Sequence, residues 1–242
     1  GQIRTGFRHS LEAVRLAEES GDIFSKAMAY TLHGFSCYYM GQFQEAIFNL
    51  TQGATFGERM NYFAWNAVSQ YYLGESHFVM GHYHQAQSFF KSAIWFLQNN
   101  IWFPSFLNFN RIALARTKLI HKPQEVQVKK LCREANQNQL KLFEGQTQHK
   151  IGDILIHSGG RHVARAEKWI RRAIASNRRN GVMFELGQDH VLLAAYFERR
   201  GQRPQARQCL DEARAIFEGC GVDWWVEHCR ETVFEKAAEI GP

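Results

Sequence analysis

The residues of this chain that could take part in acid–base or metal chemistry are mainly its histidines. His82 and His84 flank Tyr83 at a predicted turn, where two imidazoles could bind a metal ion. Two histidines do not complete a coordination shell, so we interpret them as surface or packing residues. The same interpretation is favoured for four histidines at packing positions of predicted helices: His33, His77, His157 and His190.

Motifs that would indicate an enzyme are missing from the sequence. There is no phosphate-binding glycine loop, dinucleotide fingerprint, zinc-protease motif or serine nucleophile elbow. We therefore expect this segment to lack catalytic residues, and we predict no metal and no cofactor.

A run of basic residues between Arg161 and Asn180 could bind an anionic partner. It holds seven basic residues against the single acid Glu167, a net charge of +6 that equals the net charge of the whole chain. Phosphates or an acidic neighbouring domain would suit such a surface, but the interleaved aromatics or known motif of a nucleic-acid site are missing. A solvated face or a contact between domains is favoured, and nucleic-acid binding is the alternative. Helical spacing places four of the cations on one basic stripe: Arg161, Arg165, Lys168 and Arg172.

The elements that position these residues recur every forty residues along the chain. Four positions keep the same spacing from one unit to the next: a turn residue, a small residue, a large residue and a second small residue. The turn positions are Gly41, Gly81, His121, Arg161 and Gly201, and the large positions are Leu50, Phe90, Lys130, Ile170 and Leu210. The third unit fits worst, because it carries His121, Lys130 and Arg133 where small or apolar residues are expected.

The best-formed unit resembles a tetratricopeptide repeat (TPR), with matching residues at Gly74, Gly81, Tyr83, Ala86, Phe90 and Ala93. The resemblance implies an all-α fold, a right-handed superhelical solenoid of antiparallel helix pairs. A period of forty residues instead of about 34 predicts helices longer by nearly a turn.

The repeat boundaries predict one continuous TPR-like array over residues 1–242. Pro123 is expected to open a long helix that ends near residue 143. Trp224 and Trp225 fit a hydrophobic cap better than a stacking platform for a ligand. Because the chain begins at Gly1, we expect a fragment of a larger protein. The predicted parts are the second helix of a truncated repeat at 1–21, repeats at 22–61, 62–101, 102–144 (divergent), 145–181 and 182–221, and a capping helix at 222–242.

Composition supports an array with a continuous apolar core. It also favours a location in the cytoplasm. Apolar residues make up 45% of the chain, and no apolar run approaches the length of a membrane span. No signal peptide is visible. The five cysteines are odd in number and form no CxxC pair, which favours reduced thiols.

The TPR resemblance implies that the first helix of each pair lines a concave groove, where ligands bind. Tyrosines beside an arginine are typical of protein-binding hot spots. Because long helices could instead direct these rings into the core between repeats, packing is the alternative. The projected groove residues are Phe35, Tyr38, Tyr39, Tyr71, Glu75, Phe78, Arg111 and Lys118.

Several longer stretches are similar to the C-terminal TPR arrays of bacterial multidomain signalling proteins. In those MalT-like regulators, a class III nucleotidyl cyclase or another output domain precedes a STAND-type AAA ATPase. The resemblance implies that the array senses a ligand or partner and controls the ATPase module, whose own residues would lie outside this chain. The stretches are Phe63–Glu75, Ala93–Trp95, Phe103–Phe106, Arg111–Arg116, Ala166–Ile174 and Ala215–Trp225.

Two functions follow from these patterns. The first is a non-catalytic regulatory module that binds a peptide, a protein or a neighbouring domain in its groove, and that could also self-associate. The second is a sensor for a small-molecule inducer that enters between the aromatic first helices. Ligand-dependent thermal stabilisation of the fragment alone would distinguish the second from the first.

Overall fold

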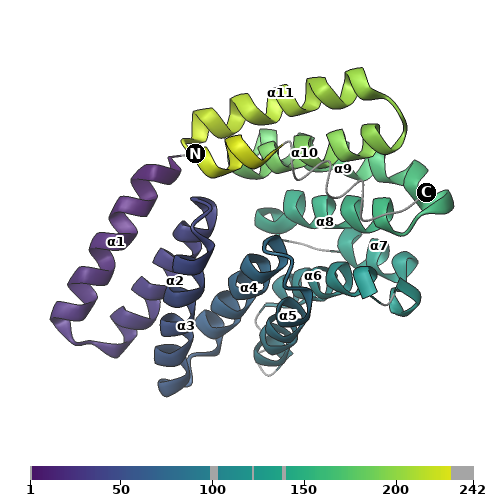
Figure 1. The fold of residues 1–242 in the computed structure, drawn as a ribbon. Coiled ribbons are helices and arrows are strands. Elements are labelled where there is room, and N and C mark those ends of the chain that lie inside the picture. Colours follow the sequence, from purple (N-terminus) through teal and green to yellow (C-terminus); the bar gives the residue numbers. More distant parts are fainter. Residues whose placement is uncertain (1, 99–102, 122, 138–139, 230–242) are drawn as a thin grey trace. The chain divides into compact units, whose positions relative to one another are not determined.

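The computed structural model describes residues 2–98, 103–121, 123–137 and 140–229, and this described part is helical without any β-strand (Figure 1). The expected all-α class is therefore confirmed. The α-helices are α1 (Ile3–Ser20), α2 (Ile23–Tyr39), α3 (Phe43–Arg59), α4 (Phe63–Val79), α5 (Tyr83–Gln98), α6 (Pro104–His121), α7 (Val128–Asn136), α8 (Glu144–His157), α9 (Val163–Arg179), α10 (Met183–Arg199) and α11 (Arg203–Cys220). Residues 223–229 are also helical.

The chain forms two compact units, one of residues 2–117 and one that begins at Lys118. In the first unit α2 pairs with α3 and α4 pairs with α5, while in the second α8 pairs with α9 and α10 pairs with α11. The predicted period is confirmed, because α2 and α4 begin at Ile23 and Phe63, and α9 and α11 begin at Val163 and Arg203. Each unit is therefore a stack of helix pairs.

The turns between helices repeat every twenty residues, twice in each repeat. In the first unit the backbone takes a left-handed conformation at Gly21, Gly41, Asn61 and Gly81, and Asn61 (φ 53°) is the only one of these that is not glycine. A left-handed residue reverses the chain at the end of a helix, and glycine adopts it without steric cost. The spacing of these residues therefore fixes the length of each helix.

Close approach within a pair depends on a glycine that faces a large side chain. A Cβ atom on Gly74 would lie 2.7 Å from the ring of Phe90, and one on Gly187 would lie 2.5 Å from the ring of Phe217. Both rings are almost fully buried. Gly74 and Phe90, two of the residues that match the TPR pattern, thus meet where α4 packs on α5.

The first helices of neighbouring pairs pack on each other. In the first unit α2 contacts α4, and in the second unit α8 contacts α10. Among the described residues, α3 and α5 make no comparable contact, nor do α9 and α11. A stack whose first helices lie closer together than its second helices curves with the first helices on its inner side. Within each unit, α2 with α4 and α8 with α10 therefore define the inner face.

The divergent third repeat differs from its prediction. The long helix expected from Pro123 to residue 143 is wrong, because Pro123–Glu125 and Lys141–Phe143 are short 3-10 helices and only Val128–Asn136 is α-helical. α7 buries just Leu131 and Cys132, and its polar Lys130 and Arg133 provide no second packing face. Most of the expected capping helix, residues 230–242, lies outside the described residues. Within the described residues, no helix has the length and apolar character needed to cross a membrane.

Candidate functional site

Four aromatic side chains gather on the inner helices of the first unit. Phe35, Tyr38 and Tyr39 come from successive turns of α2, and Tyr72 comes from α4. The ring of Tyr72 lies 5.3 Å from Phe35, 5.7 Å from Tyr38 and 6.1 Å from Tyr39, measured between centroids. We call Phe35, Tyr38, Tyr39 and Tyr72 the aromatic cluster. It joins two repeats, because α2 and α4 pack side by side.

The aromatic cluster is half open to solvent and has polar tips. Phe35, Tyr39 and Tyr72 are half-buried, whereas Tyr38 is only 9% exposed and packs edge-on against Phe43. The hydroxyl oxygens of Tyr39 and Tyr72 lie 3.2 Å apart and share a hydrogen bond. Rings with a buried body and an accessible hydroxyl can stack on an apolar group and exchange a hydrogen bond with a polar one. The cluster is therefore suited to a peptide, which offers both.

Tyr71 was projected into the same groove, but its side chain belongs to the packing between α4, α5 and α6. The residue is 6% exposed. Its ring lies 5.9 Å from Phe90, 5.9 Å from Phe106 and 5.0 Å from Phe109. Tyr71 still touches the aromatic cluster through Tyr72, at 5.0 Å between ring centroids. It can therefore support the cluster from beneath.

Glu75 and Phe78 are brought together by an arginine of α6. The guanidinium of Arg116 lies 3.8 Å from the centroid of the Phe78 ring, and one of its nitrogens lies 3.5 Å from the Glu75 carboxylate. The side chains of Arg116 and Glu75 are 10% and 6% exposed. A buried carboxylate requires a charged partner, and the ring face adds a cation–π attraction. These three side chains link α4 to α6, and we call them the charged anchor.

The remaining projected groove residues, Arg111 and Lys118, both lie on α6 and are half-buried. Lys118 belongs to the unit that begins with it, and its ammonium group lies 3.4 Å from the carboxylate of Glu125. Arg111 belongs to the first unit.

Arg165, Lys168 and Arg172 of the basic stripe lie on α9 in the second unit and are exposed. Arg161 precedes α9 in the 3-10 helix Gly160–His162, and its side chain lies outside the described part of the chain. The guanidinium of Arg172 sits 4.6 Å from the ring centroid of the buried Trp169 and donates a hydrogen bond to Asn136 on α7, at 3.3 Å.

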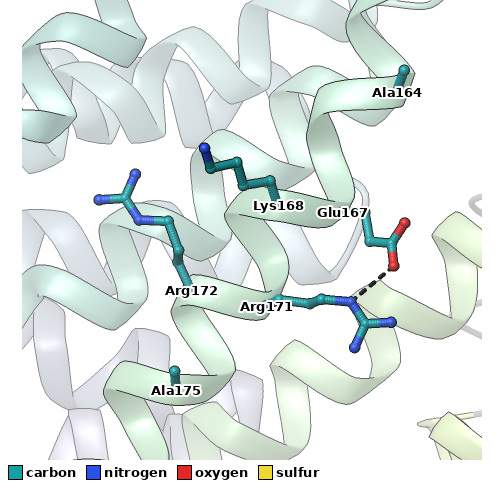
Figure 2. A pocket seen from close by; sticks show the side chains of 6 residues that line it. All are labelled: Ala164, Glu167, Lys168, Arg171, Arg172 and Ala175. Carbon is teal, nitrogen blue, oxygen red and sulfur yellow. Dashed lines mark hydrogen bonds and ion pairs between the residues drawn. The ribbon is translucent and has the colours of Figure 1, made fainter.

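A shallow depression follows the outer surface of α9 beside the stripe, with a volume of about 520 Å³. Figure 2 shows Lys168 and Arg172 extending to one side of the helix, while Arg171 turns to the other side and pairs with Glu167 at 2.8 Å. The lining residues are Ala164, Glu167, Lys168, Arg171, Arg172 and Ala175.

The histidines considered at the start are dispersed in the fold. His82 is exposed just before α5 and His84 is exposed in its first turn, whereas His77 stacks on Phe89 at 5.1 Å between centroids. Nδ1 of His33 lies 3.0 Å from the hydroxyl of Ser10. No group of three or more potential metal ligands occurs within the described ranges.

Other polar histidine contacts lie in the second unit. Nδ1 of His157 lies 2.9 Å from the Asp153 carboxylate, and Nδ1 of His190 lies 3.1 Å from the Glu212 carboxylate.

The tryptophan pair has one buried and one half-buried member. Trp225 is 5% exposed and packs against Phe184, at 5.2 Å between ring centroids. Trp224 stacks on His228 with centroids 4.2 Å apart.

Two residues of these sites were missed by reasoning from the sequence: Tyr72 on α4 and Arg116 on α6. Tyr72 is adjacent to the projected Tyr71, and one step along an α-helix turns a side chain by about 100°. Arg116 follows Glu75 by forty-one residues, one more than the repeat period. A search for opposite charges one period apart on first helices would have found it.

Comparisons with known proteins bear on the fold. No protein-family model matches the sequence, and no curated protein matches it. The crystal structure of BtubC (BKLC) from P. vanneervenii is similar, with a TM-score of 0.52, 18% sequence identity and 91% of each chain covered. At this identity the likeness concerns architecture alone, and it supports a helical-repeat fold for this chain.

Proposed function

We propose that this chain is a non-catalytic, TPR-type interaction module whose inner helices bind a peptide, a protein segment or a neighbouring domain. The observation that carries the proposal is the aromatic cluster, in which Tyr39 and Tyr72 present hydroxyl groups on half-open rings. Aromatic residues and arginine are enriched among the residues that dominate binding energy in protein interfaces. The charged anchor of Glu75, Phe78 and Arg116 joins α4, one of these inner helices, to α6.

Rigidity of the inner surface is a second argument for recognition by a preformed site. Tyr71 supports Tyr72 from the core, and Tyr38 is held between Phe43 and the cluster. Side chains that are fixed before binding lose less conformational entropy when the partner docks. The surface can therefore bind a segment without first being ordered by it.

We further propose that the module is the sensory part of a larger cytoplasmic signalling protein of bacteria. The stretches similar to MalT-like arrays support this context, and the five buried free cysteines suit a reducing compartment. In this setting a bound partner would control an ATPase or cyclase module elsewhere in the protein.

A pull-down from bacterial lysate, followed by mass spectrometry, tests the proposal. The test variant is Tyr39→Ala/Tyr72→Ala, which removes the two half-open tyrosines of the aromatic cluster. The control is Phe48→Ala/Trp95→Ala, which removes two aromatic side chains that are 58% and 57% exposed on second helices. Circular dichroism confirms that both variants are folded.

The expected result is a protein that the parent and the control capture and the test variant loses. Equal capture by both variants would contradict binding at the aromatic cluster. If the parent captures nothing, thermal stabilisation of the fragment by small-molecule extracts would instead favour an inducer sensor.

A further inference from the structure

The outward surface of α9 has the side-chain pattern of a helix-docking seam. Its exposed residues include Ala164, Lys168, Arg171, Ala175 and Arg178, separated by steps of four, three, four and three residues. Such alternation keeps one line of side chains facing a second helix that crosses at a shallow angle. Arg165, Arg172 and Arg179 flank this line at intervals of seven residues and are also exposed. We call these eight residues the α9 seam.

Comparison with the equivalent helix of the next repeat shows that the seam's charge is particular to α9. A similar depression lies on α11, and Arg203, Arg207 and Ala215 are among its lining residues. Four other lining residues, Pro204, Gln208, Asp211 and Glu212, stand forty residues after Ala164, Lys168, Arg171 and Arg172. Packing of the repeat therefore requires no cations at these positions. α11 places acids where α9 places arginines.

The positive surface continues onto α7. Lys129, Lys130 and Arg133 are exposed there, and Arg172 contacts Asn136 at the C-terminal end of α7. The charge of Arg165 also acts on the thiol of Cys132 in α7. Two helices of the second unit thus contribute to one positive field, which would attract an anionic partner over a distance of about 10 Å at moderate salt.

Several seam cations can be released for a partner at little cost. Arg171 and Glu167 form a largely exposed pair within the helix, and such pairs contribute little to stability. Arg179 forms a similar exposed pair with Glu144. Lys168 makes no hydrogen bond or ion pair with another described residue. Carboxylates of a partner could therefore replace the present ones.

We propose that the α9 seam is a second binding surface and that it docks an acidic α-helix of a protein partner. Ala164 and Ala175 allow the partner helix to approach closely, because they leave the depression between the longer cations. The flanking arginines recur after about 10.5 Å of helix, which is the interval between carboxylates placed seven residues apart on the partner. Guanidinium groups can bind such carboxylates through paired hydrogen bonds.

A protein helix fits this surface better than a nucleic acid does. Single strands are usually bound by exposed aromatic rings between the cations. On α9 the aromatic residue is Trp169, which is 6% exposed and lies beneath Arg172. Ala164 and Ala175 suit contact with a helix, and their methyl groups offer phosphates no hydrogen bond. Nucleic acid is the competing outcome of the experiment below.

The experiment measures fluorescence anisotropy of defined probes at about 0.15 M salt. The first probe is a synthetic helical peptide whose heptads place glutamates beside a seam of alanine and leucine. The second has every glutamate replaced by glutamine, and the third is a single-stranded RNA of similar length. The test protein is Lys168→Gln/Arg171→Gln/Arg172→Gln. The matched control, Arg203→Gln/Arg207→Gln/Arg214→Gln on α11, loses the same formal charge.

The proposal predicts that the acidic peptide binds the parent, and that the test protein binds it at least about tenfold more weakly while the control stays within about twofold. The glutamine peptide and the RNA should bind more weakly than the acidic peptide. Tighter binding of RNA, or equal weakening by the control, would overturn the proposal. If the triple variant does not fold, the single change Lys168→Glu at an exposed position serves, and unchanged peptide affinity there would also overturn it.

Discussion

Arg116 lies over the ring of Phe78, with its guanidinium carbon 3.8 Å from the ring centroid. The same group neutralises the buried carboxylate of Glu75, so the inner surface of the first unit includes a charge pair that is almost excluded from solvent. A pair of this kind stabilises the fold only while both members are present.

The charged anchor predicts a large effect when its cation alone is removed. Arg116→Met leaves Glu75 buried without this partner, and the free energy of unfolding should fall by about 3–5 kcal/mol. The double change Glu75→Gln/Arg116→Met removes both charges and should recover at least half of the loss. Urea unfolding of the three proteins checks this, and equal losses in the single and double variants would contradict a compensating pair.

The close approach of α4 and α5 predicts opposite effects of the same substitution at two glycines. Gly74→Ala places a methyl group 2.7 Å from the Phe90 ring, which is 1% exposed and has no space to move, so stability should fall by about 1–3 kcal/mol. Gly6→Ala in α1 meets no atom within 4 Å and should raise stability by up to about 1 kcal/mol. Thermal unfolding measures both, and destabilisation of similar size at the two positions would argue against the contact.

The left-handed backbone conformation at Asn61 leads us to predict that glycine is favoured at this position. Asn61→Ala should lower stability by about 1 kcal/mol, because alanine adopts a φ of 53° less readily than asparagine does. Asn61→Gly should keep or slightly raise stability. Asn180→Ala is the control, since this exposed helix-end residue has a φ of −91°. A melting temperature that falls equally for Asn61→Ala and Asn180→Ala would contradict the requirement.

Buried histidines predict loss of stability in mild acid. Burial lowers the pKa of His77 below its usual 6.5, and the neighbouring His82 lowers it further. Burial likewise lowers the pKa of His33 and of His190. The folded state therefore favours the neutral rings. The contribution of these neutral rings to stability is complete above about pH 6.5, the pKa of histidine in the unfolded chain. It is lost as the pH falls through the lowered pKa values of the folded state.

The measurement is the melting temperature between pH 7.5 and 5.5. It should decline in the parent and decline less in His77→Phe, which keeps an aromatic ring against Phe89 and removes the titrating group. His84→Phe, which changes an exposed imidazole in the first turn of α5, is the matched control. A slope that is the same in all three proteins would show that His77 does not contribute.

The repeat was accessible from the sequence because its spacing is set by local chemistry. Gly41 and Gly81 reverse the chain, and Gly74 and Phe90 fit one another, so these residue types alone mark the turns and the contact between paired helices. α7 could not be predicted in the same way. Its weak apolar face does not define where a helix ends, and the prediction from Pro123 was too long.

The residues of the inner surface could be predicted only in part from the sequence, because the direction of each side chain depends on how its helix is rotated about its own axis. The projection selected Tyr71, whereas the half-open ring belongs to Tyr72, one residue or about 100° away. Phe35 and Tyr39 were projected and do meet Tyr72. The role of Arg116 depends on packing between α4 and α6, which no local pattern specifies.

Site-specific photo-crosslinking tests the proposed function most directly. A benzophenone amino acid replaces Tyr39 in one protein and the exposed Phe48 of α3 in another, and each is irradiated in bacterial lysate. The account predicts a discrete crosslinked protein from position 39 that is reduced by the Tyr72→Ala change, and no such product from position 48. Crosslinking at position 48 alone, or at neither position, would contradict binding at the aromatic cluster.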